Sequence, residues 1–233
     1  VNFFQEAFIM KSSFQTRRLT TSAMMIALAT VIAFVCGLIP FLNFPFGGGI
    51  TIASMLPIVL ISYFYGIRWG LLSGFTYSII QMLLGFNTVS ALFTPESDSF
   101  MGITNAVLIC LIDYVLAYTA LGLGGLFRKQ KNKVSALVLG TIVSLTVCYI
   151  FHIISGAIFY GAWADWFFTQ PVVYDFIGKS VLANFSGTGL SVIYSIVYNG
   201  CYMIPEIILS SFVAVFIARL PQVHPVSNTT EKK

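Results

Sequence analysis

Two carboxylic acids, Asp113 and Glu206, lie inside otherwise apolar stretches of the sequence. A carboxylate at the depth of a lipid bilayer costs about 2.5–3.5 kcal/mol even on the lenient insertion scale, so it needs a compensating partner. The apolar stretches contain no Lys or Arg that could supply one. Asp113 is therefore either protonated and hydrogen-bonded among helices or paired with a bound cation. We favour the cation, because ionisable residues inside membranes are usually functional.

Two later apolar stretches place polar and aromatic residues at helical spacing. His152, Gly156 and Tyr160 recur every fourth residue, which puts a titratable ring, a gap and an aromatic ring on one helix face. In the last apolar stretch, Tyr194 and Asn199 enter from the same side, and a buried amide must be hydrogen-bonded. A lone histidine is often a packing residue, and tyrosines alone could form an interfacial belt. The combination, however, is typical of a pocket lining.

Asp113 and its neighbour Tyr114 would meet these side chains if the three helices were adjacent. The predicted result is a small aromatic pocket with one negative charge, opening to the outside. Aromatic rings stack on a planar cation and the carboxylate neutralises it, so the expected ligand is flat, cationic and water-soluble. Glu206 follows on nearly the same helix face as Asn199. It could extend this pocket, bond to backbone freed by Pro205, or contact a partner subunit.

The composition places these residues in a membrane. Of the 233 residues, 58% are apolar and only 9% are charged, whereas soluble domains carry about 25% charged residues. This excludes a soluble globule, a disordered chain and a nucleic-acid-binding protein. A helix needs roughly 20 apolar residues to cross a bilayer. We predict an all-α bundle of six transmembrane helices over about 19–39, 50–65, the stretch after the turn 66–70 up to 84, 102–127, 134–159 and 190–218.

The basic residues predict the orientation of this bundle. Of the twelve Lys and Arg, all but Lys179 flank the predicted helices on one side. Lys and Arg in short flanking loops stay in the cytoplasm, so both termini are predicted to be cytoplasmic. The chain then divides into a cytoplasmic N-terminal segment (1–18), a membrane domain (19–219) and a cytoplasmic tail (220–233) that is predicted to be disordered.

The sequence lacks motifs for catalysis or metal binding. Gly178-Lys179-Ser180 resembles the end of a phosphate-binding loop, but the first glycine of that loop would fall on Val173. No Gly-x-Ser-x-Gly occurs, and the four cysteines lie in apolar segments without Cys-x-x-Cys spacing. We therefore predict no enzyme, no cofactor and no metal site. An intramembrane enzyme using His152 and Asp113 is the weakest alternative.

The order of these residues resembles a known family, the substrate-binding S components of energy-coupling factor (ECF) transporters, and within it the thiamine-specific members. The resemblance covers about residues 18–219. It rests on Gly48-Gly49 with Leu56-Pro57-Ile58, Arg68-Trp69-Gly70, Asp113-Tyr114, the run from His152 to Tyr160 and the run from Tyr194 to Asn199. The last three, in order and on separate predicted helices, are the most specific.

The resemblance implies a six-helix S component that captures thiamine from outside a bacterial plasma membrane. Asp113 would meet the cationic thiamine, and the pocket would be lined by Tyr114, His152, Gly156, Tyr160, Tyr194 and Asn199. Ala23 and Ala27 on the first helix look like the family's docking face for a transmembrane coupling subunit. Two ATPase subunits of a shared module would then drive transport, in agreement with the missing phosphate loop.

The chain also departs from the family pattern. Some members have Glu where this chain has Asp113, and Trp where it has Tyr160. A Trp found in the first outer loop of some members has no match near Gly48. A thiamine-like substrate is expected, and the alternatives are another vitamin or a precursor such as a hydroxymethylpyrimidine.

Overall fold

The chain is helical throughout the part that the structure describes. The computed structural model describes the backbone of residues 2–44 and 47–226, and the side chains from residue 13 onward within these ranges. Besides helices, these residues form an isolated antiparallel bridge between Asn43 and Gly49, and no strand. The predicted all-α class is therefore confirmed for these ranges. The tail predicted over 220–233 lies largely outside them, because residues 227–233 are not described.

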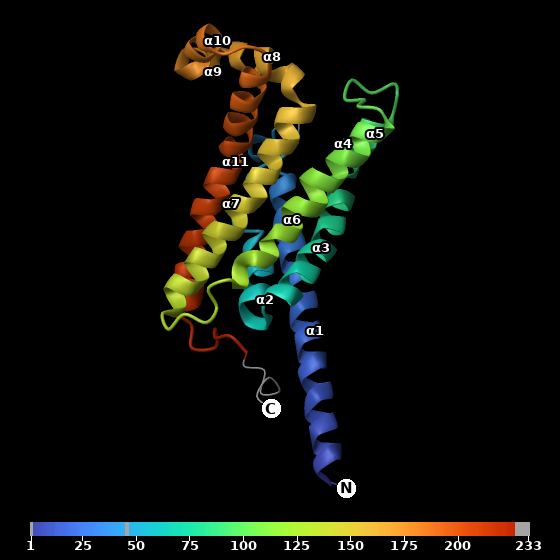
Figure 1. Cartoon of the computed structure of the whole chain (residues 1–233), viewed down its shortest axis with the longest axis vertical. Helices are drawn as coiled ribbons and strands as arrows, with labels where there is room; N and C mark the ends of the chain where they lie inside the picture. Colours follow the sequence, from blue (N-terminus) through green and yellow to red (C-terminus); the bar gives the residue numbers. More distant parts are fainter. Residues whose placement is uncertain (1, 45–46, 227–233) are drawn as a thin grey trace.

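Four helices in the described ranges have the length and hydropathy needed to cross a bilayer (Figure 1). Three are α1 (Asn2–Gly37), which begins before the predicted start at residue 19, α7 (Lys133–Phe159) and α11 (Gly187–Ala218). The fourth is continuous through α5 (Ile103–Ile109), η2 (Cys110–Leu116), α6 (Ala117–Thr119) and η3 (Ala120–Gly125). Within it, η2 is a π-helix, whose wider turn changes the direction in which its side chains point.

A bent helix pair adds a fifth candidate crossing. α3 (Ile67–Leu84) and α4 (Phe86–Phe93) meet at an angle of 76°, and together they pass the same test of length and hydropathy. The bend lies at Gly85, where the sequence predicted that the third helix ends and a loop begins. The second half of the pair was therefore missed, because α4 occupies part of that predicted loop.

The predicted helix over 50–65 is wrong for its first part. Only α2 (Leu56–Tyr65, 10 residues) is helical, and it begins beside Pro57, which fits the first turn of a helix. Ile52 and Ala53 before it have φ values of 36° and 63°, in the left-handed region that an α-helix cannot use. At 1.5 Å per residue α2 is about 15 Å long, roughly half of a bilayer's hydrocarbon core.

The aromatic segment after α7, predicted as a loop, is a cap of short helices. These are η4 (Gly161–Trp163), α8 (Ala164–Thr169), α9 (Pro171–Val173), η5 (Tyr174–Gly178) and α10 (Lys179–Asn184), at the top of Figure 1. Phe167 turns inward and packs edge-on against Tyr194 and Tyr198, with ring centroids 5.5 and 5.7 Å away. Val172 and Phe176 face outward and are 83% and 87% exposed. The cap therefore has an inner face on α11 and an apolar outer face.

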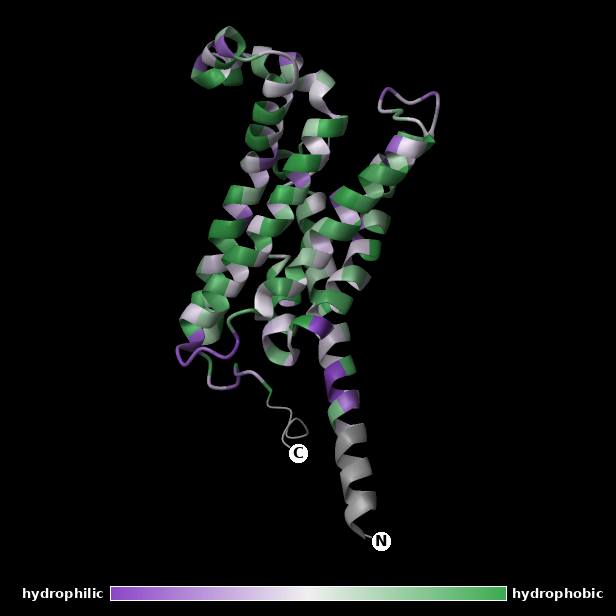
Figure 2. Ribbon diagram, in the orientation of Figure 1, coloured by the Kyte–Doolittle hydropathy of each residue, from purple (hydrophilic) through white to green (hydrophobic). Residues whose placement is uncertain are grey.

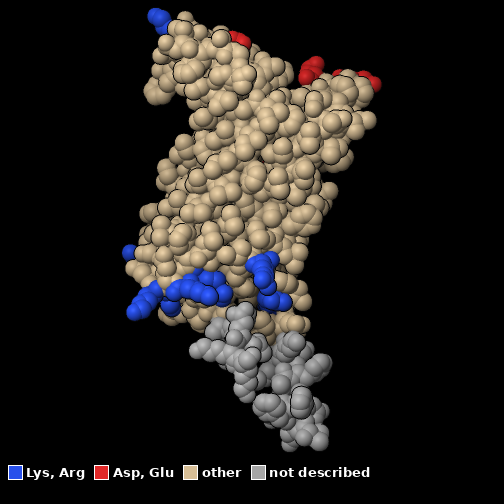
Figure 3. All heavy atoms as spheres, in the orientation of Figure 1, with Lys and Arg blue, Asp and Glu red and all other residues tan. Residues whose placement is uncertain are grey.

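The molecular surface is typical of a membrane protein. Large apolar side chains of α1, α7 and α11 are exposed along the middle of the molecule, which Figure 2 shows as hydrophobic ribbon between more hydrophilic ends. Figure 3 shows most of the basic residues gathered at the end where α7 begins and the acidic residues at the opposite end, where a basic side chain also lies. This separation of charge along the long axis fits a molecule embedded in a bilayer, with lipid around its middle.

Two arginines hold helices together at the basic end. The Arg128 guanidinium donates to the carbonyl oxygens of Tyr63, Phe64 and Val226, at 3.2, 3.1 and 3.0 Å. It therefore caps the C-terminal end of α2 and ties the chain after α11 to it. Arg18 lies 3.9 Å above the Trp69 ring, and the indole N–H of Trp69 donates to Ser22 of α1 at 2.8 Å.

Glycines allow the helices in the middle of the molecule to pack closely against one another. α7 packs along α11 on one side and on η3 on the other. A Cβ built on Gly140 of α7 would lie 2.0 Å from the carbonyl oxygen of Gly124 in η3, which is an impossible contact with rigid backbone. Small residues at such crossings are the main means of tight helix packing in membranes.

We expect Gly140→Ala to separate α7 from η3 and to destabilise the protein by about 1–3 kcal/mol, the usual cost of overpacking. Thermal unfolding of the detergent-solubilised protein measures this as a lower melting temperature. Gly189→Ala in α11 is the matched control, since its new Cβ would meet only Phe185 at an ordinary 3.8 Å. Equal melting temperatures for the two variants would contradict this account of the packing.

Candidate substrate-binding site

The structure brings the predicted pocket residues of three helices to one place. All of the residues predicted to bind substrate line a single pocket: Asp113, Tyr114, His152, Gly156, Tyr160, Tyr194 and Asn199. They come from η2, from α7 with its C-terminal flank, and from α11. The convergence was predicted from helical spacing and from the assumption that the three helices are neighbours. Their contact with a substrate stays a prediction.

Residues that were not predicted complete the pocket. Gly47 and Gly48 line it from the loop after α1, and Thr88 and Leu92 from α4, together with Tyr198 and Tyr202 of α11. The two tyrosines share a helix face with the predicted residues, and the Gly-rich stretch that holds Gly47 and Gly48 indicated an outer loop, so these four carried a signal in the sequence. Thr88 and Leu92 reach the pocket because of the 76° bend before α4, which no sequence pattern indicates.

A larger cavity adjoins this pocket. Its volume is about 540 Å³, within the range of small-molecule sites, and it shares Asp113, Tyr114, His152 and Tyr202 with the pocket. Further lining comes from the outer half of α1, from Asn43 and Phe44, from residues within 47–55 and from the bend between α3 and α4. The space therefore suits a ligand larger than a single ring, with Asp113 at the junction of both parts.

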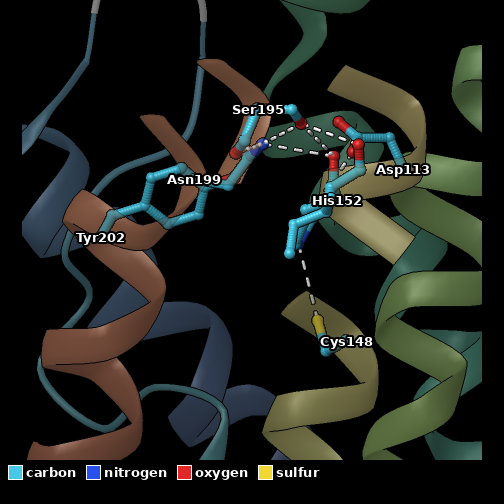
Figure 4. Close-up of polar contacts among 7 residues, drawn as sticks. Asp113, Cys148, His152, Ser195, Asn199 and Tyr202 are labelled. Carbon is cyan, nitrogen blue, oxygen red and sulfur yellow. Dashed lines mark hydrogen bonds and ion pairs between the residues drawn. The ribbon is translucent and has the colours of Figure 1, made fainter. Parts of the chain in front are cut away.

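Asp113 is paired with His152. The His152 Nδ1 atom lies 2.8 Å from the carboxylate Oδ1, and the imidazole is 5% exposed. The other ring nitrogen, Nε2, lies 3.5 Å from the Cys148 Sγ atom one turn earlier in α7 (Figure 4). With its proton on Nδ1, a neutral imidazole satisfies both contacts, donating to the carboxylate and accepting from the thiol. Asp113 then keeps its negative charge, and 27% of its side chain stays exposed.

This pair was missed in the sequence. The reasoning from the sequence considered only Lys and Arg as partners of Asp113, and it placed His152 in the pocket without pairing the two. No spacing rule relates residues on different helices, and the π-helical turn of η2 sets where Asp113 points. The Asp113 carboxylate therefore has a partner within the protein, in addition to any bound cation.

Asn199 joins α7 to α11 and is hydrogen-bonded, as expected for a buried amide. Its Nδ2 group donates to the carbonyl oxygens of His152 and Ser195 at 3.2 and 2.8 Å, and its Oδ1 atom accepts from the Tyr202 hydroxyl at 2.5 Å. Both ends of the amide thus have protein partners (Figure 4). Gly156 is required beside this network, because a Cβ there would lie 2.3 Å from the Ser195 Oγ atom.

The loop after α1 packs against the aromatic wall of the pocket. The Phe44 ring lies 5.9 Å from each of the Tyr198 and Tyr202 rings, and the Tyr198 hydroxyl donates to the Gly47 carbonyl at 3.1 Å. Gly48 has a φ of 78°, and a Cβ there would lie 2.5 Å from the Tyr202 ring. The Gly-rich loop therefore lies directly over α11, as a cover on this side of the pocket.

The small residues of α1 form two differently placed pairs. Ala29 and Ala33 are 0% and 8% exposed and face the bundle. Ala23 and Ala27, the pair predicted to dock a partner, are exposed on the helix surface. They are available for contact with another helix, whereas the first pair is already used within the chain.

Comparison with known proteins places this chain in a family. Residues 19–186 match the family model of the thiamine transporter proteins. The thiamine transporter ThiT of Bacillus subtilis is 31% identical over 218 residues, spanning 88% of this chain and 91% of that protein. A solved structure of ThiT from Listeria monocytogenes has the same fold, with a TM-score of 0.53 at 20% identity over 84% of this chain and 94% of that one.

These matches confirm the thiamine-specific resemblance seen in the sequence. They also confirm a multi-pass membrane transporter of bacterial type, rather than an enzyme, and agree with the apolar helices of the structure. The protein belongs to the thiamine transporter family.

Proposed function

We propose that this protein is the S component of an ECF-type importer and captures thiamine at the pocket beside Asp113. The observation that carries the proposal is the Asp113 carboxylate, held 2.8 Å from His152 within a pocket lined by tyrosines. Thiamine consists of two planar rings joined by a methylene group, one of them a permanently cationic thiazolium, and the relative from Bacillus subtilis is a thiamine transporter. A carboxylate in a site of low polarity attracts such a cation more strongly than it would in water.

The side chains around Asp113 have different proposed roles. Tyr194 is 2% exposed and held by Phe167 of the cap, so its ring is a rigid surface for stacking. Asn199 has both ends of its amide bonded within the protein, so we assign it the role of fixing the pocket wall. Tyr114 and Tyr160 flank Asp113 from the other side. Aromatic faces around a carboxylate favour a planar cation over a neutral ligand of the same size.

We propose six membrane crossings with both termini in the cytoplasm. α2 and the irregular residues 50–55 before it form the additional crossing beside the four long helices and the bent pair α3–α4. The basic end, with Arg128 and the loop before α7, is then the cytoplasmic face. The acidic end, which carries the cap α8–α10, faces outward. The pocket lies toward that outer end, between the cap and the middle of α7.

The proposed partners are a transmembrane coupling subunit and two ATPase subunits. Ala23 and Ala27 lie exposed one turn apart on α1, which permits another helix to approach closely. The chain itself lacks a complete phosphate-binding loop, since Val173 stands where the first glycine is needed. ATP hydrolysis must then come from other subunits.

The proposal is tested by equilibrium binding of thiamine to the purified protein, with quenching of tryptophan or tyrosine fluorescence as the measure of binding. Competition with riboflavin, pyridoxine and a hydroxymethylpyrimidine separates thiamine from another vitamin or a precursor. Recovery of unchanged ligand, checked by mass spectrometry, distinguishes binding from turnover. A panel in which thiamine competes no better than the others would overturn the substrate assignment.

Asp113→Asn is expected to weaken thiamine binding by about 10- to 100-fold, the value of a hydrogen-bonded charge partner. The amide keeps the shape of the side chain and a contact with His152 but removes the charge. Titration of fluorescence measures the change. Asp98→Asn in the exposed turn after α4 is the control and should bind as the parent protein does. Undiminished binding by Asp113→Asn would disprove the charge pairing.

Ala27→Leu is expected to block assembly with the coupling subunit and leave thiamine binding unchanged, because it adds bulk only on the exposed face of α1. Co-purification with the ATPase module measures assembly, and fluorescence titration measures binding. Met24→Leu is the control, since Met24 is already large and 68% exposed. Normal co-purification of Ala27→Leu would place the docking surface elsewhere.

A further inference from the structure

Glu206 is a second carboxylate inside the molecule, and the proposed binding mechanism does not use it. It lies in the middle of α11 and is 1% exposed. Among the side chains that the structure describes, in 13–44 and 47–226, no Lys, Arg or His forms an ion pair with it. A buried carboxylate without a cation must receive hydrogen bonds from several donors. The donors that it receives indicate what it does.

One of its two hydroxyl donors comes from the irregular segment before α2, defined here as the hinge segment, Thr51–Met55. The Thr51 hydroxyl donates to the Glu206 Oε2 atom at 3.0 Å, and the Ser54 hydroxyl supports Thr51 at 2.8 Å. The backbone of Ala53 and Met55 also approaches the carboxylate. The second hydroxyl donor, Ser210 at 3.1 Å, belongs to α11 itself.

The hinge segment needs such an acceptor. Its residues are not helical, and Ala53 is held at a φ of 63°. Apart from the N–H of Ser54, which donates to the Thr51 carbonyl, its backbone N–H groups lack the backbone partners that a helix would provide. Irregular backbone at membrane depth is tolerated only where the protein satisfies its polar groups. One carboxylate can accept several hydrogen bonds at once, whereas an amide of the same size offers a single oxygen.

The hinge segment is continuous with the loop that covers the pocket. The backbone N–H of Ile50 donates to the Leu42 carbonyl at 2.9 Å, which closes the loop, and Thr51 follows directly. Gly48 of the same loop contacts Tyr202 of α11. Tyr202 and Glu206 lie one turn apart on the same face of α11. This face of α11 therefore contacts both the covering loop and the hinge segment that follows it.

We propose that Glu206 is a positioning residue that anchors the hinge segment to α11 and thereby holds the covering loop closed over a bound ligand. The idea rests on the proposed function, because the ligand meant is thiamine. It does not require Glu206 to touch the ligand: Thr51 and Ser54 line the adjoining cavity, and the carboxylate lies behind them.

Glu206→Gln tests the proposal in the purified full chain by stopped-flow fluorescence with thiamine. The dissociation rate should rise by about tenfold or more, as for loss of a charge-assisted hydrogen bond, while the association rate changes little. Hydrogen exchange followed by mass spectrometry should show faster exchange in the peptide covering 47–55 and unchanged exchange in α7. A general loss of stability would raise exchange in both.

Ser210→Ala is the matched control. It removes a donor to the same carboxylate, but that donor belongs to α11 and does not hold the hinge segment. Its dissociation rate and its exchange in 47–55 should equal those of the parent protein. Thr51→Val removes the same contact from the other side. As a single variant it should raise the dissociation rate, but combined with Glu206→Gln it should add little, because the two groups act through one interaction.

Parent-like dissociation and exchange in both Glu206→Gln and Thr51→Val would overturn the proposal. If Glu206→Gln does not fold, Thr51→Val decides the question by the same two measurements. The exchange experiment needs no ligand, so it separates two failures. A parent protein that does not bind thiamine refutes the proposed function, whereas unchanged exchange in 47–55 refutes the anchor.

Discussion

Lipid offers no hydrogen bonds, so every polar group that this chain buries at bilayer depth must find its partner inside the protein. The three polar centres of the molecule each meet this constraint differently. Asp113 is paired with His152, and Asn199 is hydrogen-bonded to backbone and hydroxyl groups of α7 and α11. Glu206 accepts a hydrogen bond from the hinge segment. Each of the three groups has at least one partner on a different element. Satisfying these groups therefore also determines which elements are neighbours.

Close helix packing is the second requirement of the site. Gly156 allows α7 to approach Ser195 of α11, and Gly140 allows the same helix to approach η3 on its other side. α7 is thus held between the two elements that supply the rest of the pocket. Without these contacts the His152 ring would not reach Asp113, since long side chains in their place would separate the backbones. The polar pair depends on the glycines as much as on its own residues.

The sequence predicted the long apolar helices well, because hydropathy over roughly 20 residues responds directly to the bilayer. It failed where irregular backbone is stabilised by tertiary contacts. Residues 50–55 are as apolar as a helix, yet Ile52 and Ala53 take left-handed conformations that Glu206 helps to stabilise from a distant part of the chain. Spacing within helices correctly grouped the pocket residues, whereas Thr88 and the Asp113–His152 pair depend on a bend and a π-helical turn that leave no periodic signal.

The short helix α2 combines several of these features. Arg128 holds its C-terminal end through the carbonyl groups of Tyr63 and Phe64, and Glu206 holds the Thr51 hydroxyl in the hinge segment before its N-terminal end. Between these two anchors, α2 is nearly completely buried. A short helix that is held at both ends and buried along its length can move only as a rigid body. A displacement at the basic end of the molecule, where Arg128 lies, is therefore transmitted through α2 to the base of the loop over the pocket.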